Sequence, residues 1–188
     1  MISSDVTAGF VLVGGKSSRM GRDKALLPFQ GKPLVEHVAE AVRAAAGSLA
    51  LIGNPAAYGH LGYPVFPDSV AAGPLGGICS ALENSAAEWN LVLACDMPEV
   101  SPEFLSELLE RAVRSEADCF LPAGPSGMLE PLCAAYHARC LAEIRGAIER
   151  GVRKITDGLR TLRMEIWRVN SDSCFRNINT YDEWRMLF

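Results

Sequence analysis

The chain has 188 residues, enough for a sizeable hydrophobic core, and we expect a single domain over 1–188. Its hydrophobic share of 49% and its charged share of 21% are usual for a soluble globular protein. The net charge of −4 argues against nucleic-acid binding, and no apolar run is long enough to span a membrane. No signal peptide is evident and the six cysteines form no C-x-x-C pattern, so we predict reduced, mostly buried thiols in a cytoplasmic protein.

The first predicted element is a buried strand over Phe10–Val13, which ends at Gly14 and Gly15. The loop that follows carries four cations and one carboxylate: Lys16, Arg19, Arg22 and Lys24, and Asp23. Glycines let backbone N–H groups approach an anion, and the cations neutralise it. The loop fits neither the Walker A pattern nor the dinucleotide fingerprint. It therefore predicts another kind of phosphate loop, the alternative being a surface connection with solvated basic residues.

Helical and apolar stretches then alternate along the chain. In order, we expect a helix over 33–46, strands over 49–52 and 63–66, a helix over 75–84, a strand over 90–95, a helix over 101–114, strands over 119–121 and 132–136, a helix over 137–150, a strand over 164–169 and a helix over 180–188. This alternation predicts an α/β fold with a mostly parallel sheet covered on both faces. Ligands bind at the carboxyl ends of such strands, so the loops after Val13, Ile52 and Cys95 should meet at one edge.

Two carboxylates stand at positions suited to nucleotide chemistry. Asp96 directly follows the most apolar strand, where it could hold Mg²⁺ between phosphates, or merely cap the next turn. Asp68 precedes a glycine-rich loop containing Gly73, whose backbone could meet a flat base or serve only close helix packing. We find no arrangement typical of a covalent nucleophile, and we interpret Cys95 as a core thiol. This suits phosphoryl or nucleotidyl transfer, which depends on positioning and charge neutralisation.

Together the motifs resemble a known family. The basic loop and the residues after it, VLVGGKSSRMGRDKALLPFQGKPLVEHV, resemble a signature found in nucleotidyltransferases. This signature reads L-A-G-G-x-x-x-R-M-G-x-D-K followed by G-K-P-L. Further matches are PDSVAAGPLGGI, LACDMP, EPLCAAY and FRNINTYDEW, in the right order over almost the full length. This resemblance is to the molybdenum cofactor guanylyltransferases, enzymes that join GMP from GTP to molybdopterin.

The resemblance implies a Rossmann-like three-layer α/β/α sandwich. It implies catalytic roles for Arg19 and Lys24 at the triphosphate and for Asp96, which would also bind Mg²⁺. Asn177 and Asn179 would lie on the molybdopterin side. The implied GTP-binding residues are Leu12, Val13, Gly14, Gly15, Lys24, Asn54, Asp68, Gly73, Pro74, Leu75 and Asp96.

Two departures from the family pattern concern the nucleotide pocket. Val13 replaces the usual alanine of the signature, which makes that wall bulkier. After the second strand some relatives place an asparagine against the nucleotide; counting sets Ile52 at that place, with Asn54 two residues further on.

The reaction implied is attack by a terminal phosphate oxygen of molybdopterin on the α-phosphorus of GTP, with release of pyrophosphate. A cytidylyltransferase for the same cofactor, a sugar-phosphate nucleotidyltransferase, and a nucleotide-binding protein that only delivers the cofactor are the alternatives. We expect transient contact with cofactor-delivery proteins or apo-molybdoenzymes, and neither nucleic acid nor membrane as a partner.

Overall fold

A computed structural model describes residues 6–14, 23–70 and 72–176 of the chain. Its strands are β1 (Thr7–Leu12), β2 (Pro28–Phe29), β3 (Lys32–Pro33), β4 (Ala50–Ile52), β5 (Val65–Phe66), β6 (Trp89–Ala94), β7 (Cys119–Ala123), β8 (Cys133–His137) and β9 (Met164–Arg168). Its α-helices are α1 (Leu34–Ala46), α2 (Pro55–Tyr58), α3 (Pro74–Glu83), α4 (Pro102–Val113), α5 (Cys140–Glu149) and α6 (Ile155–Gly158). Short 3₁₀ turns are η1 (Lys24–Leu26), η2 (Gly59–Leu61) and η3 (Ser173–Phe175).

Within the described residues, seven strands form one sheet in the order β5-β4-β1-β6-β8-β7-β9. The pairs β4–β5, β1–β4, β1–β6 and β7–β9 are parallel, which confirms the mostly parallel sheet. Strand β8 runs antiparallel to both β6 and β7. It follows β7 through a connection without a helix, and a parallel neighbour would have required a crossover.

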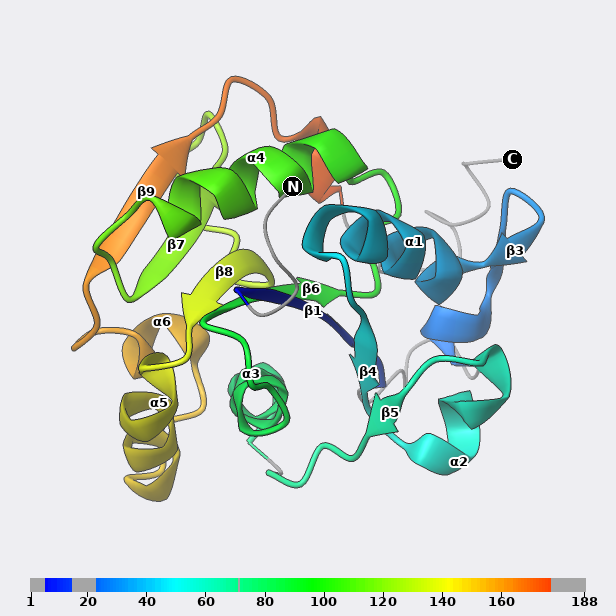
Figure 1. The fold of residues 1–188 in the computed structure, drawn as a ribbon, viewed down its shortest axis with the longest axis horizontal. Helices are drawn as coiled ribbons and strands as arrows, with labels where there is room; N and C mark the ends of the chain where they lie inside the picture. The colour runs from blue at the N-terminus through cyan, green and yellow to red at the C-terminus, as the bar shows by residue number, and fades with distance from the viewer. Residues whose placement is uncertain (1–5, 15–22, 71, 177–188) are drawn as a thin grey trace.

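Helices cover both faces of this sheet, as Figure 1 shows. Helices α1 and α4 pack together on one face, and α3, α5 and α6 lie on the other. This confirms the sheet covered on both faces that the alternation of elements predicts, and the three-layer α/β/α sandwich that the resemblance implies. Local signals fix the helix ends: Gly47 takes the left-handed conformation after α1, and the Ser101 hydroxyl accepts the Phe104 N–H at the start of α4.

The sheet separates two hydrophobic layers. Val11 and Leu91 point to the side of α1 and α4, whereas Phe10 and Val92 point to the side of α3 and α5. Alternation along buried strands places apolar side chains on both faces, which explains why these strands read as continuous apolar runs.

Most expected elements are present with shifted ends. The expected helix over 137–150 begins at Cys140, because His137 is the last residue of β8. The fourth strand expected along the chain, over 90–95, is β6, and it ends at Ala94 so that Cys95 and Asp96 form the turn after it. The helix expected over 180–188 lies outside the described residues.

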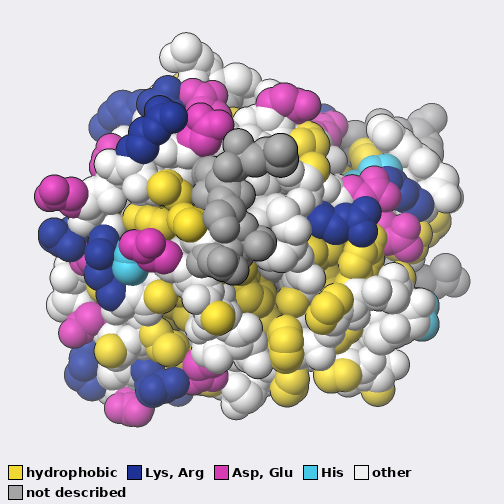
Figure 2. Space-filling model, in the orientation of Figure 1, with side chains coloured by type: hydrophobic (Ala, Val, Ile, Leu, Met, Phe, Trp, Pro, Cys, Tyr) yellow, Lys and Arg dark blue, Asp and Glu magenta, His cyan; other side chains and the backbone are white. Residues whose placement is uncertain are grey.

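All six cysteines have free thiols and five of them are buried, as the sequence predicted. Among the described residues, no helix is long and apolar enough to cross a membrane. On the face seen in Figure 2, basic and acidic side chains are interspersed around a lower middle region with more hydrophobic side chains. This face therefore carries no extended patch of one charge.

Candidate active site

The carboxyl ends of β1, β4 and β6 open into one cavity of about 780 Å³. The loops after Leu12, Ile52 and Ala94 form its walls, and the start of α3 closes another side. This is the sheet edge at which the sequence placed the ligand. The lining residues are Leu12, Val13, Gly14, Asp23, Lys24, Ala25, Ile52, Gly53, Asn54, Pro55, Pro67, Asp68, Gly73, Pro74, Gly77, Ala94, Cys95, Asp96 and Leu132.

An ion pair lines the cavity. Lys24 Nζ lies 2.9 Å from Asp96 Oδ2, joining the first residue of η1 to the turn after β6. The two side chains are only 14% and 24% exposed, so their charges are screened less than those of surface pairs. A cation and a carboxylate held together here can receive a phosphate and a divalent metal ion respectively.

Asp23 ties the turn that carries Lys24 to the rest of the fold. Its Oδ1 accepts a hydrogen bond from Ala25 N at 3.0 Å and thereby caps η1. Its Oδ2 accepts a 2.6 Å hydrogen bond from the hydroxyl of Tyr58, at the end of α2. Burial, followed by the bond to Asp23, raises the pKa of the Tyr58 hydroxyl, so it remains protonated and donates.

A second carboxylate and polar backbone also line the cavity. Asp68 is exposed, and its Oδ1 accepts a 3.3 Å hydrogen bond from the buried Ser80 hydroxyl on α3. Gly73 and Pro74 begin α3 and line the wall beside it. A carboxylate next to polar backbone suits a base edge that presents both donors and acceptors.

The part of the cavity wall formed by the loops after β1 and β4 depends on close packing of the backbone. Val13 N donates to Ile52 O at 2.9 Å, which joins the loops after β1 and β4. A Cβ on Gly53 would come within 2.6 Å of both the carbonyl oxygen and Cγ2 of Val13, so only glycine fits there without a shift. The bulkier Val13 is therefore accommodated by the glycine opposite it.

The cavity holds most residues named from the sequence. Both Ile52 and Asn54 line it; the Asn54 side chain also caps α2 by accepting Ala56 N at 3.0 Å. Leu75 does not line it, because its side chain is fully buried on the far side of α3 against Gly158. Gly15, Arg19, Asn177 and Asn179 lie outside the described residues. The remaining candidates line the cavity: Leu12, Val13, Gly14, Lys24, Asp68, Gly73, Pro74 and Asp96.

Sequence reasoning missed several residues at the site. Asp23 is the one acidic residue among the cations of the basic loop, and nothing in the sequence marks it as a partner of Tyr58, which is distant along the chain. Leu132 also lines the cavity, and its carbonyl oxygen accepts a 2.8 Å hydrogen bond from Ala94 N. It belongs to the EPLCAAY motif, so this motif could have indicated that Leu132 lies at the cavity.

Besides Tyr58, two further groups, Cys95 and Glu130, have shifted pKa values. Burial, followed by the charge of Asp96, raises the pKa of Cys95 to about 12, so its thiol is protonated and a poor nucleophile. Burial, followed by the charges of Asp172 and Asp96, raises the pKa of Glu130. The Cys95 environment is that of a core thiol and does not suit covalent catalysis.

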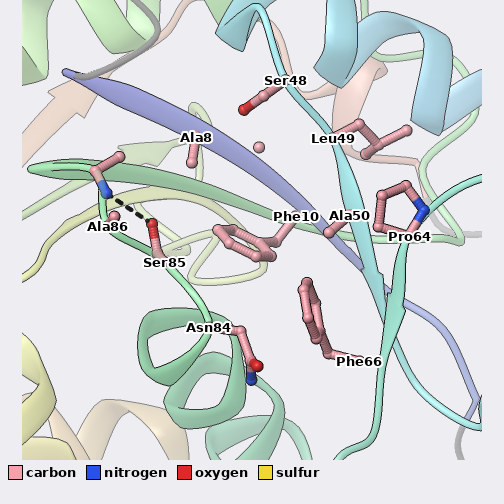
Figure 3. Close-up of a pocket in the computed structure, with 12 residues that line it drawn as sticks. Ala8, Phe10, Ser48, Leu49, Ala50, Pro64, Phe66, Asn84, Ser85 and Ala86 are labelled. Carbon is pink, nitrogen blue, oxygen red and sulfur yellow. Dashed lines mark hydrogen bonds between the residues drawn. The ribbon is translucent and has the colours of Figure 1, made fainter.

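A second cavity, of about 510 Å³, lies at the opposite edge of the sheet (Figure 3). The rings of Phe10 and Phe66 face it from β1 and β5, and Ala87 N donates to Ser85 Oγ at its rim. Its lining residues include no charged side chain. It therefore offers nothing to a phosphate, and the first cavity is the candidate active site.

The sequence matches a described family over most of its length. The profile of the MobA-like NTP transferase domain matches residues 9–164. The chain belongs to this family.

Named relatives are also similar to the chain over nearly its full length. A probable molybdenum cofactor guanylyltransferase of Flavobacterium johnsoniae is 39% identical over 177 residues, covering 93% of this chain and 92% of that protein. A molybdenum cofactor guanylyltransferase of Cupriavidus taiwanensis is 32% identical and covers 98% of both chains. The crystal structure of molybdopterin-guanine dinucleotide biosynthesis protein A from Archaeoglobus fulgidus has a TM-score of 0.82 and 28% identity, over 96% of both chains.

Proposed function

We propose that this chain transfers GMP from GTP to the terminal phosphate of molybdopterin and releases pyrophosphate. The relatives named as molybdenum cofactor guanylyltransferases support this function, since they match the chain nearly from end to end. The observation that carries it is the cavity, which is lined by the Lys24–Asp96 ion pair, by Asp68 and by the start of α3.

The size and polarity of the cavity suit a nucleoside triphosphate. Its volume of about 780 Å³ falls in the range of pockets that enclose small ligands. The triphosphate would lie toward Lys24, and the guanine toward Asp68, Gly73 and Pro74. Asp68 can accept from the donor edge of guanine, whereas cytosine presents a carbonyl oxygen and a ring nitrogen acceptor beside its single amino group.

The residues present fit Mg²⁺ bound together with the substrate. The described residues contain no group of three or more His, Cys, Asp or Glu side chains that could hold a metal by themselves. Mg²⁺ needs no such group, since it binds proteins through one or two carboxylates and takes its other ligands from phosphates and water. Asp96 would hold it, and the bound ion would offset negative charge on the phosphate oxygens.

The chain's own residues would then position and neutralise the triphosphate. The attacking oxygen of the molybdopterin phosphate is already ionised, so no general base is required. A new bond forms between this oxygen and the α-phosphorus, the bond to the bridging oxygen breaks, and pyrophosphate leaves. Lys24, with Arg19 of the same loop, would stabilise the charge on the leaving pyrophosphate.

The molybdopterin would approach from the side of Asp96 and Leu132. We assign Asn177 and Asn179 to that side, on the resemblance of the closing motif. Transient docking of cofactor-delivery proteins or apo-molybdoenzymes would take place there too. We place the reaction in the cytoplasm, which the six free thiols support.

A nucleotide panel tests the proposal. The melting temperature is measured with GTP, CTP, ATP or UTP, each with Mg²⁺, and we expect the largest rise with GTP. Asp96→Asn should abolish the part of the rise that depends on Mg²⁺ and lower the rate of pyrophosphate release about 100-fold. Stabilisation by CTP alone would contradict guanylyl transfer, and full Mg²⁺-dependent activity of Asp96→Asn would contradict the role of Asp96.

A further inference from the structure

Tyr58 at the end of α2 contacts Asp23, the residue that caps η1 and precedes Lys24. This contact has no part in the chemistry proposed above. The Tyr58 hydroxyl donates a 2.6 Å hydrogen bond to Asp23 Oδ2, and Asp23 is the residue before Lys24. We propose that Tyr58 is a positioning residue which, through Asp23, holds the Lys24 ammonium at Asp96 in the orientation needed for nucleotidyl transfer.

The two oxygens of Asp23 have different tasks. Oδ1 accepts Ala25 N and shapes the first turn of η1, the turn that carries Lys24. Oδ2 fixes the whole turn to α2 through Tyr58. Asp23 thus joins the local backbone geometry of Lys24 to an element that comes from a distant part of the chain.

Lys24 needs such a support more than a shorter residue would. A lysine side chain has several rotatable bonds and loses substantial rotamer freedom when its ammonium is held at one point. Its Nζ lies 2.9 Å from Asp96 Oδ2, and a small rotation of η1 would move it away. A fixed backbone at Asp23 therefore limits the positions that the ammonium can reach, which is preorganisation of charge.

Helix α2 is itself fixed at its other end by the cavity wall. Asn54 caps α2 by accepting Ala56 N, and Asn54 also lines the cavity beside Gly53. Tyr58 lies one helical turn further on, and its buried side chain belongs to the same hydrophobic cluster as the buried residues of α1. A chain of contacts thus runs from the wall at Asn54 through α2 and Asp23 to Lys24.

The ring and the hydroxyl of Tyr58 can be separated by substitution. The side chain is 2% exposed, so Tyr58→Phe keeps the packing and removes only the donor. Asp23 lines the cavity, where water can replace the lost bond. We therefore expect Tyr58→Phe to melt within about 2 °C of the parent, while its kcat falls about tenfold and its KM for GTP changes less than about twofold.

The dependence on Lys24 distinguishes positioning from a general structural role. In a Lys24→Ala background, Tyr58→Phe should change kcat less than about twofold, because the group that it positions is gone. Tyr63→Phe is the matched control: it is the same exchange at a half-buried tyrosine that we place outside the site, and it should leave kcat unchanged. An equal tenfold loss in both backgrounds would overturn the proposal.

The proposal rests on the proposed function for its kinetic test, so a second measurement reports on Lys24 without any substrate. Lysine acetylation by acetic anhydride is quantified by mass spectrometry, with exposed Lys154 as the internal reference. Tyr58→Phe should raise the labelling of Lys24 relative to Lys154 about threefold, because a less restrained ammonium is more accessible. Unchanged labelling would overturn the positioning role, whereas a parent protein that fails to use GTP would overturn only the proposed function.

Discussion

Gly53→Ala tests whether the loops after β1 and β4 pack as closely as the cavity requires. The added Cβ would lie 2.6 Å from the Val13 carbonyl oxygen and 2.6 Å from Val13 Cγ2. The carbon of a real side chain does not approach an oxygen this closely, so the backbone at Val13 or Gly53 has to move. Overpacking of this kind costs about 2 kcal/mol, and for a chain of this size that lowers the melting temperature by roughly 4–8 °C.

Gly59→Ala is the matched control. Gly59 has a helical backbone with φ of −60°, and nothing lies within 4 Å of the position that its Cβ would take. The added methyl group should leave stability unchanged or raise it by about 0.5 kcal/mol through the unfolded state. Circular dichroism melts and urea titrations of both variants provide the comparison. A Gly53→Ala protein that melts within 1 °C of the parent, with unchanged affinity for nucleotide, would refute the tight contact between these loops.

Three further predictions concern separate parts of the fold. The hydrogen bond from the Arg163 side chain lowers the pKa of Asp118 to about 2. This carboxylate therefore stabilises the fold at pH values above its unfolded pKa, and the stabilisation is lost as the pH falls toward 2. Asp118→Asn should lower the free energy of unfolding, measured in urea titrations, by about 1.5 kcal/mol at pH 7 and by much less at pH 2. Ser101→Ala removes the cap of α4 and should lower the free energy of unfolding by about 1 kcal/mol, with kcat unchanged. Cys95→Ala should keep kcat within about threefold of the parent, because a thiol with a pKa near 12 is no nucleophile; loss of all turnover would contradict this.

The place of the candidate site was predictable because the cavity follows from topology. Parallel strands bring their carboxyl ends to one edge, so the loops after Val13, Ile52 and Cys95 had to meet if the strand assignments were right. Lys24 and Asp96, far apart in the chain, are then within 2.9 Å. Gly47 after α1 and Ser101 before α4 are residue types typical of helix ends, so the ends of these two helices depend on local sequence.

Other features depend on geometry that sequence spacing does not carry. The resemblance to the family implies that Leu75 binds GTP together with Gly73 and Pro74. Successive helical residues point in different directions, however, and the Leu75 side chain faces Gly158 in the core. Strand β8 is antiparallel because no helix lies between β7 and β8 to carry the chain back for a parallel pairing. The general alternation of helices and strands along the chain does not indicate this exception. The bond from Tyr58 to Asp23 joins residues whose types and spacing form no motif.

The most direct test of the central claim is pyrophosphate release in the presence of molybdopterin, Mg²⁺ and one nucleoside triphosphate at a time. We expect release with GTP at a rate at least about 100-fold above that with CTP, ATP or UTP. We also expect no pyrophosphate release when molybdopterin is omitted, and a rate of release about 100-fold lower in Asp96→Asn. Equal or faster release with CTP would contradict guanylyl transfer, and tight GTP binding without release would indicate a protein that only holds the nucleotide.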